Sequence, residues 1–137
     1  MSCMDKTFDK ILKGKIKITQ LKSGFRYGFD TIFLAAFVNG FLKKYKKKSI
    51  LLADVGTGVS SISLVLALKN NNLKITAIEN NLQYLKIADE NIINNNFQKN
   101  IELINSNIFN INRNLINHFD IVVSNPPYYN KGNNKSK

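Results

Sequence analysis

The sequence predicts an α/β fold in which about four parallel strands alternate with helices. Two observations lead to this prediction: short apolar runs recur along the chain, and segments with helical spacing of apolar residues separate them. The apolar runs lie at residues 50–55, 74–78, 101–104 and 119–124. Runs without polar alternation are typical of strands buried on both faces of a parallel sheet. Right-handed βαβ units would join them into part of a doubly wound sheet.

Two segments between these strands are predicted to be helices. The first begins at Ser60 and carries apolar residues through residue 68. The second, residues 82–96, has apolar residues at positions 82, 85, 88, 92 and 93, which is helical spacing. Asparagine-rich patches fall where loops are expected between the elements.

A short hairpin-like entry and one helix are expected before the first core strand. Residues 15–20 alternate polar and apolar side chains, which is typical of a half-exposed strand, and residues 22–24 are the expected turn after it. Asp30 is a candidate N-cap for a helix that is apolar on most faces and ends near Gly40. We expect that helix to be buried.

Length and charge limit the class of protein. A chain of 137 residues can build one domain with a core, divided here into an N-terminal extension of residues 1–48 and a core of residues 49–137. The net charge of +11 favours a polyanionic partner such as RNA. The Asn-, Ile- and Lys-rich composition is a second explanation of that charge. The basic run of residues 43–48 is interpreted as a solvated helix end or linker.

The remaining composition excludes other classes. Cys3 is the single cysteine and His118 the single histidine, so neither an internal disulfide nor a metal site is predicted. The N-terminus has no signal-peptide pattern, and no apolar stretch approaches the roughly 20 residues of a membrane span. A cytoplasmic protein is expected.

Polar residues follow the expected strands at one end. Asp54 leads into the turn Gly56-Thr57-Gly58, Glu79 closes the next strand, and Asn107 and Asn125 follow the third and fourth. The carboxyl ends of parallel strands share one edge, so one crevice would collect these residues. Glycines let the backbone approach a ligand, and a carboxylate can accept both ribose hydroxyls. The pattern therefore predicts a nucleoside site.

Two cofactors compete for such a site. A dinucleotide site typically has a third glycine and a helix N-terminus directed at the pyrophosphate. This turn has two glycines and begins with the carboxylate of Asp54. S-adenosylmethionine carries no phosphate, and its ammonium and ribose suit an acidic, glycine-lined turn. S-adenosylmethionine is favoured.

The tetrapeptide Asn125-Pro126-Pro127-Tyr128 forms a rigid turn after the last strand, because two prolines fix φ and remove two N–H donors. Asn125 Oδ1 and the Pro126 carbonyl are acceptors that can hold the two hydrogens of an exocyclic amine, and Tyr128 offers a stacking face. The alternative is that Asn-Pro simply ends the strand.

In this order and spacing, these motifs resemble those of class I S-adenosylmethionine-dependent methyltransferases that methylate amines, over about residues 15–130. Within that class, the segment Gly-Phe-Arg-Tyr-Gly-Phe-Asp at residues 24–30 is similar to the small-domain adenine-N6 methyltransferases of valine tRNA. The Asn-Pro-Pro-Tyr turn also occurs in release factor glutamine methyltransferases. Those enzymes have a longer helical N-terminal domain, so the resemblance favours the tRNA enzymes.

The resemblance implies a Rossmann-like sheet and a set of site residues. Gly56 and Gly58 would line the methionine part of the cofactor with Asp54 and Thr57 beside them, and Glu79 would bind the ribose. Asn107 stands where the family has an aspartate that contacts the adenine amino group, and Ser60 replaces a third glycine. Asp30 would close over the cofactor or only cap its helix. The catalytic residues would be Asn125, Pro126, Pro127 and Tyr128.

The resemblance also implies direct methyl transfer to adenine in a tRNA loop, stacked on Tyr128. Sheets of this family continue after the Asn-Pro-Pro-Tyr turn, so the chain is expected to be a truncated form. Its last strand, with the apolar residues 121–123, would be an exposed edge that pairs with a separately encoded part or with a second copy. The alternative function is an inactive cofactor- or RNA-binding remnant.

Overall fold

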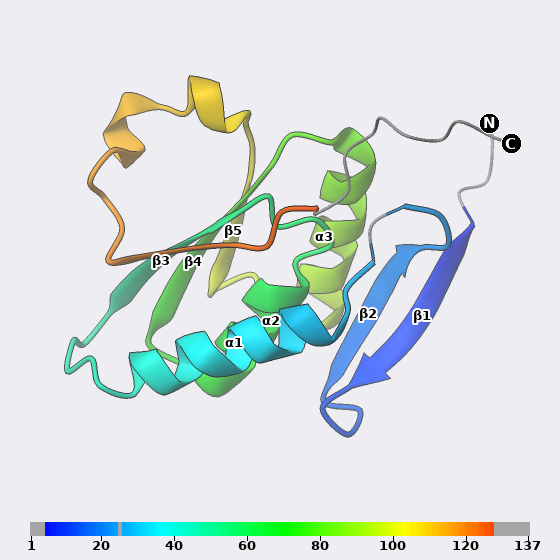
Figure 1. Cartoon of the computed structure of the whole chain (residues 1–137), viewed down its shortest axis with the longest axis horizontal. Helices are drawn as coiled ribbons and strands as arrows, with labels where there is room; N and C mark the ends of the chain where they lie inside the picture. Colours follow the sequence, from blue (N-terminus) through cyan, green and yellow to red (C-terminus); the bar gives the residue numbers. More distant parts are fainter. Residues whose placement is uncertain (1–4, 25, 128–137) are drawn as a thin grey trace, which may run out of the picture.

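The computed structural model describes residues 5–24 and 26–127, which form an antiparallel hairpin, a parallel sheet and three α-helices (Figure 1). Tyr128, predicted to stack on the substrate, lies outside the described residues. In chain order the elements are β1 (Lys6–Ile11), β2 (Ile16–Leu21), α1 (Phe29–Leu42), β3 (Ile50–Val55), α2 (Ser61–Lys69), β4 (Leu73–Glu79), α3 (Leu82–Asn94), β5 (Ile101–Asn105), the 3₁₀ turns η1 (Ile108–Asn110) and η2 (Arg113–Leu115), and β6 (Ile121–Ser124).

The main sheet confirms the predicted α/β fold. Its four strands are parallel and lie in the order β5-β4-β3-β6. The chain moves outward from β3 through β4 to β5 and then returns to pair β6 with the other side of β3. This reversal is a topological switch point, and ligands of open α/β sheets bind at the carboxyl ends of the strands beside it.

One face of the sheet carries the core. Helices α2 and α3 pack on this face, and its side chains, among them Leu52, Ile75 and Ile101, are buried. Side chains of the opposite face include the exposed Lys74, Glu102 and Val122. The prediction that the strands are buried on both faces is therefore wrong for β4, β5 and β6. The β5–β6 connection forms two 3₁₀ turns in place of an α-helix, so no α-helix covers that face in the described part of the chain.

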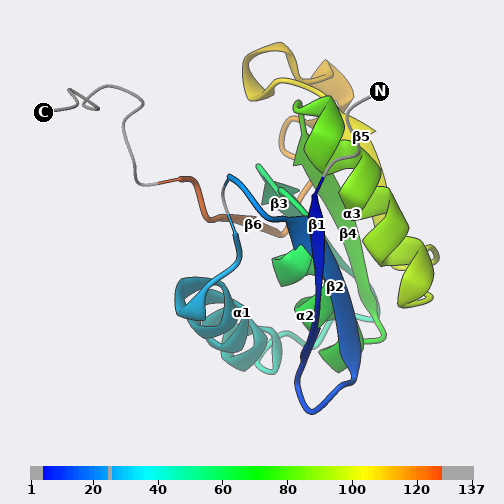
Figure 2. The same cartoon turned by 90° about the vertical axis from the view of Figure 1, so that its right-hand side faces the viewer.

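The N-terminal hairpin differs from its prediction in two ways. Strand β1 was not predicted, and the hairpin turn lies between β1 and β2, at residues 12–15, whereas residues 22–24 follow the pair. In β2 only Lys17 is exposed, so the half-exposed strand that alternation predicted is almost wholly buried. The cause is tertiary: β2 packs against α3, as Figure 2 shows from the side.

Helix α1 buries one face and exposes the other. Its buried residues face α2, whereas its exposed residues form a ridge on the opposite side. The prediction of a buried helix is wrong for this ridge, because α2 is the main neighbour of α1 among the described residues. The buried residues are Thr31, Ala35, Val38 and Leu42, and the exposed ridge consists of Phe29, Phe33, Phe37 and Phe41.

Candidate functional site

The glycine turn lies at the carboxyl end of β3 and is hydrogen-bonded to the end of β4. The backbone N–H groups of Gly56 and Thr57 both donate to the Ile78 carbonyl, at 2.9 and 3.0 Å. Gly56 and Gly58 have φ of 69° and 59°, in the left-handed region that favours glycine. A Cβ added at either glycine would meet no heavy atom within 4 Å. The turn therefore borders open space into which a ligand can approach the backbone.

Glu79, at the end of β4, is bonded directly to this turn. Its Oε2 accepts the Gly58 N–H at 3.0 Å, and its Oε1 accepts the N–H groups of Asn80 and Asn81 at 2.9 and 3.0 Å. Three backbone donors thus fix the orientation of the carboxylate. Because two carboxylate oxygens offer about four acceptor positions, Glu79 retains capacity for a ligand hydroxyl.

Asp54 is buried beneath the turn, with 1% of its surface exposed. Its Oδ2 accepts the hydroxyl protons of Thr57 and Ser63 at 2.7 and 2.6 Å, while its Oδ1 has no hydrogen-bond partner among the described residues. Burial raises the pKa of Asp54; the two hydroxyl hydrogen bonds lower it, and the neighbouring Glu79 carboxylate raises it.

The residues around the turn fit the cofactor that the sequence predicts. The orphaned Oδ1 of Asp54 is an acceptor, the glycine turn is open, and the fixed Glu79 carboxylate lies beside it. These groups match a ligand that brings donors, such as an ammonium and ribose hydroxyls, and they offer no cation to a phosphate.

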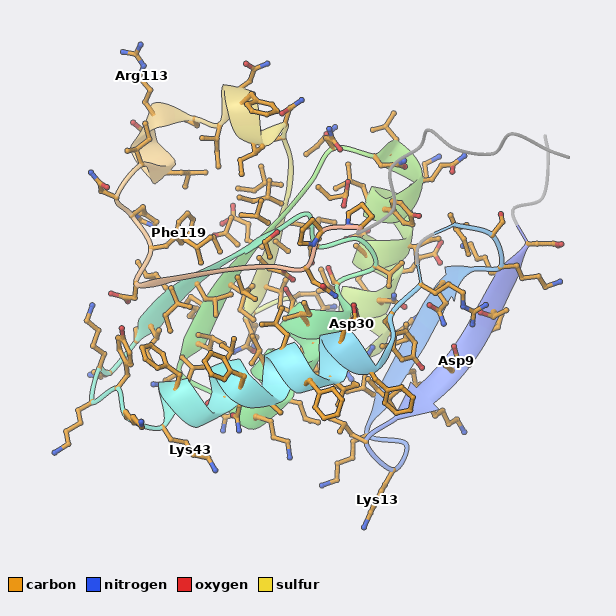
Figure 3. The ribbon with its side chains drawn as sticks, viewed as in Figure 1. Asp9, Lys13, Asp30, Lys43, Arg113 and Phe119 are labelled. Atoms are coloured by element: carbon orange, nitrogen blue, oxygen red, sulfur yellow. The ribbon has the colours of Figure 1, made fainter. Side chains whose placement is uncertain are left out.

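Asn125 is held at the carboxyl end of β6 by the start of α1. Its Nδ2 donates to Asp30 Oδ2 at 3.0 Å and to the Thr31 hydroxyl oxygen at 3.4 Å, and 7% of the residue is exposed. A carboxylate only accepts, so the amide nitrogen faces Asp30 and the amide oxygen is directed elsewhere. Figure 3 labels Asp30 at the N-terminal end of α1. Pro126 and Pro127 are exposed.

The predicted site residues therefore form two groups at one edge of the sheet. Asp54, the glycine turn and Glu79 are linked by direct hydrogen bonds, and Asn125 is linked to Asp30. The Ser124 hydroxyl joins the groups because it donates to the Val55 carbonyl at 2.9 Å. The sheet positions both groups since β3, β4 and β6 end at the same edge.

Asn107 and Asp30 make contacts that the sequence did not predict. Asn107 is exposed and its Oδ1 accepts the Phe109 N–H at 3.0 Å, so its side chain caps η1. Gly28, and not Asp30, is the N-cap of α1, so the capping prediction is wrong. The Asp30 carboxylate instead bonds the Asn125 amide. Their assignment to the cofactor stays a prediction.

Sequence patterns missed three residues that support the site: Thr31, Ser63 and Asn91. Thr31 and Ser63 left no signal, because their contacts with Asn125 and Asp54 depend on where helices α1 and α2 pack. Asn91 did leave one, since it is a polar residue on the apolar face of its helix. It is fully buried and donates to the Val59 carbonyl in the turn.

Within residues 5–24 and 26–127, no helix is long and apolar enough to cross a membrane. The same residues contain no cluster of three His, Cys, Asp or Glu side chains that could hold a metal ion.

A glycine turn after β3, a carboxylate after β4 and an Asn-Pro-Pro turn after β6 form the arrangement that the sequence predicted for a methyltransferase with S-adenosylmethionine as cofactor. A family model described as "Methyltransferase small domain" matches residues 34–137. The chain belongs to the methyltransferase small domain family.

Two kinds of curated relative are similar in sequence. The release factor glutamine methyltransferase of Buchnera aphidicola subsp. Acyrthosiphon pisum (strain APS) is 40% identical over 90 residues, covering 66% of this chain and 31% of the relative. The tRNA1(Val) (adenine(37)-N6)-methyltransferase of Haemophilus influenzae (strain PittEE) is 31% identical over 116 residues, covering 84% of this chain and 47% of the relative. The chain thus spans about a third to a half of the length of these relatives.

Solved structures agree in fold. The S-adenosylmethionine-dependent methyltransferase of Agrobacterium tumefaciens superposes with a TM-score of 0.73 at 13% identity, over 93% of this chain and 41% of that one. TYW2 of M. jannaschii, solved in complex with S-adenosylmethionine, has a TM-score of 0.64 at 16% identity, over 81% of this chain and 48% of that one. At these identities the likeness establishes the fold.

Proposed function

We propose that this chain is the cofactor-binding and catalytic part of an N-methyltransferase that methylates the N6 amine of adenine in tRNA. The observation that carries the proposal is the fixed orientation of Asn125. Its amide nitrogen donates to Asp30 and Thr31, which fixes the orientation of the amide, and an amide oxygen has two lone pairs with which it can accept a hydrogen from a substrate amine. A cytoplasmic protein, as the sequence predicts, would meet this substrate.

The residues at the strand ends would divide the work between binding and orientation. Glu79 and the glycine turn would hold the nucleoside end of S-adenosylmethionine, which supplies the methyl group when bound. Asn125 Oδ1 and the Pro126 carbonyl would accept the two amine hydrogens, favour electron density at nitrogen and orient it for transfer. No residue of the chain would act as a covalent nucleophile.

The extent of the sequence matches supports tRNA as the substrate. The match to the Haemophilus influenzae tRNA enzyme covers 84% of this chain, so it cannot omit the whole N-terminal extension of residues 1–48. That extension contains Asp30 and Thr31, the two residues that orient Asn125. The net charge of +11 also suits a polyanion.

A second candidate is methylation of a glutamine side chain in a release factor. It is favoured by the 40% identity to the Buchnera aphidicola enzyme, which exceeds the identity to the tRNA enzymes. A glutamine side chain ends in an NH₂ group with two hydrogens, so the same pair of acceptors could hold it.

The test is methyl transfer from radiolabelled S-adenosylmethionine to an unmodified tRNA(Val) transcript and, in parallel, to a purified release factor. We expect label in the tRNA. Asn125→Ala should lower the rate by at least about 100-fold, a loss of the size seen when a group that stabilises the transition state is removed. It should leave cofactor affinity, measured by calorimetry, within about twofold. Asn71→Ala, which truncates an exposed asparagine in the loop between α2 and β4, at the opposite edge of the sheet, is the matched control.

Each other outcome identifies a different error. Label in the release factor would replace tRNA by glutamine as the substrate. Undiminished tRNA methylation by Asn125→Ala would refute the catalytic assignment. Cofactor binding without transfer to either substrate, or no binding at all, would support the inactive remnant.

We also propose a polypeptide partner for the edge of the sheet. Among the described residues β6 pairs only with β3, and Val122 on it is 65% exposed. A separately encoded part or a second copy that pairs with this edge would cover it.

A further inference from the structure

Two asparagines form hydrogen bonds with the edge of β2 that does not pair with β1. Asn91 lies within α3, and Asn95 is the C-cap of that helix. Asn91 Oδ1 accepts the Thr19 N–H at 2.8 Å, and its Nδ2 donates to the Thr19 carbonyl at 2.9 Å. One helical turn later, Asn95 makes the same pair of bonds with Lys17, at 2.9 and 2.7 Å. Side-chain amides thus pair with alternate residues of the strand as a neighbouring strand would. Both asparagines hold the hairpin on α3.

Asn91 makes one contact that Asn95 does not. Its Nδ2 also donates to the Val59 carbonyl at 2.9 Å, whereas the second bond of Asn95 Nδ2 stays within α3, to the Asn91 carbonyl. Val59 lies between Gly58 and Ser60, which both have left-handed φ values of 59° and 64°. Asn91 therefore bonds the middle of the cofactor turn at the point where its backbone is most unusual.

This contact holds the backbone directly after Gly58. The peptide groups on either side of Val59 are turned by two left-handed residues, and Val59 itself is buried. Without Asn91 the Val59 carbonyl would be a buried acceptor that has lost this donor, and rotating toward water would relieve it. The Val59 carbonyl shares its peptide group with the Ser60 N–H, so that rotation would break the Ser60 N–H bond to the Thr57 carbonyl, at 3.0 Å. The turn that brings the Gly58 N–H to Glu79 Oε2, at 3.0 Å, would thereby lose its closing bond.

We propose that Asn91 is a positioning residue for the cofactor site: it fixes the glycine turn against Glu79 and couples that turn to the N-terminal hairpin. The proposal rests on the proposed function in one respect, namely that this turn binds S-adenosylmethionine. Asn91 is fully buried and its hydrogen bond to the turn goes to the Val59 backbone, so it acts on the ligand through the turn.

The test compares Asn91→Ser with Asn95→Ser. Both variants lose the paired bonds to β2, and both are expected to lower the melting temperature. Only Asn91→Ser should raise the dissociation constant for S-adenosylmethionine, by about tenfold, the factor that corresponds to one net hydrogen bond. Calorimetry measures this constant at a temperature where both variants are folded.

A second readout needs no cofactor. We expect the Gly58 amide to exchange with solvent deuterium about tenfold faster in Asn91→Ser and at an unchanged rate in Asn95→Ser. In the unaltered protein, the Gly58 and Thr19 amides should open together, since Asn91 bonds Thr19 directly and bonds the glycine turn through the Val59 carbonyl. This last measurement applies even when Asn91→Ser does not fold.

Equal cofactor affinity and equal Gly58 exchange in the two variants would overturn the proposal, as would independent opening of Gly58 and Thr19 in the unaltered protein. Failure of the proposed function looks different. In that case the unaltered protein would not bind S-adenosylmethionine, while the exchange comparison would still show whether Asn91 positions the turn.

Discussion

At the scale of single residues, Ser60 sits in a backbone conformation that favours glycine. It is buried and has φ of 64°, and its hydroxyl oxygen lies 3.2 Å from the hydroxyl oxygen of Thr57. The sequence had marked Ser60 as the replacement of a third glycine, and the backbone explains why a glycine suits this position. A side chain in the left-handed region costs roughly 1–2 kcal/mol.

We predict that Ser60→Gly stabilises the chain by about 0.5–1 kcal/mol, because relief of the left-handed strain exceeds the entropy that glycine adds to the unfolded state. Ser61→Gly is the matched control, since Ser61 begins α2 and glycine there should cost about the same amount. Urea denaturation measures both changes. Destabilisation of equal size in both variants would contradict the strain assigned to Ser60.

The raised pKa of Asp54 predicts how the stability of the folded protein depends on pH. Burial raises its pKa in the folded state above the value of 3.8 that is usual for the unfolded chain, so the folded protein keeps the proton longer. Its contribution to stability is therefore present at low pH and is lost as pH rises through the folded-state pKa. The amide introduced by Asp54→Asn does not titrate, and its oxygen can still accept the Thr57 and Ser63 hydroxyls.

The measurement is the urea midpoint of the unaltered protein and of Asp54→Asn between pH 4 and 8. We expect the stability of Asp54→Asn relative to the unaltered protein to increase with pH. Asp89→Asn, at an exposed position of α3, controls for the loss of one negative charge. Parallel profiles for the unaltered protein and Asp54→Asn would mean that Asp54 is ionised in the folded state at all these pH values.

At the scale of elements, sequence patterns located the strands of the main sheet well and the hairpin poorly. The strand predicted at residues 50–55 is β3 without change, and the one predicted at residues 119–124 differs from β6 only in its start. Strand β1 was missed because four of its six residues, Lys-Thr-Phe-Asp-Lys-Ile, are polar, and they form a strand only through pairing with β2. A local sequence pattern does not show which other strand a segment will pair with.

Helix α1 is the element with the most unusual surface. Phe33 and Phe37 on its outer ridge are 71% and 75% exposed, although aromatic side chains are normally buried in monomers. In a chain of net charge +11, electrostatic repulsion opposes association at low salt, and screening removes that opposition as salt rises. We therefore expect self-association that increases with salt.

The double variant Phe33→Lys and Phe37→Lys should abolish this association and leave the melting temperature nearly unchanged, because neither ring is buried. Sedimentation velocity at low and high salt measures it. Gln83→Lys combined with Gln98→Lys adds the same charge at exposed positions elsewhere and is the control. If the control abolishes association as fully as the double variant, net charge and not the ridge is responsible.

At the scale of the whole molecule, the open surfaces have a common character. The exposed face of the sheet, the β6 edge and the Phe ridge of α1 are all apolar in part. Figure 2 places β6 and α1 on the same side of the molecule. The curated relatives are two to three times as long as the matched part, as their coverage of 31% to 47% implies. Larger relatives have more chain with which to cover such surfaces.

Local sequence signals were enough to predict the α/β class, the parallel strands and the residues at their carboxyl ends, because strand periodicity, glycine turns and proline turns are each visible within a few residues. Three features depend on how the elements pack: the bond from Asn125 to Asp30, the bond from Asn91 to the glycine turn, and the exposure of one face of α1. These contacts join residues far apart in the chain: Asp30 and Asn125 are 95 positions apart. Packing, which no local pattern encodes, brings them together.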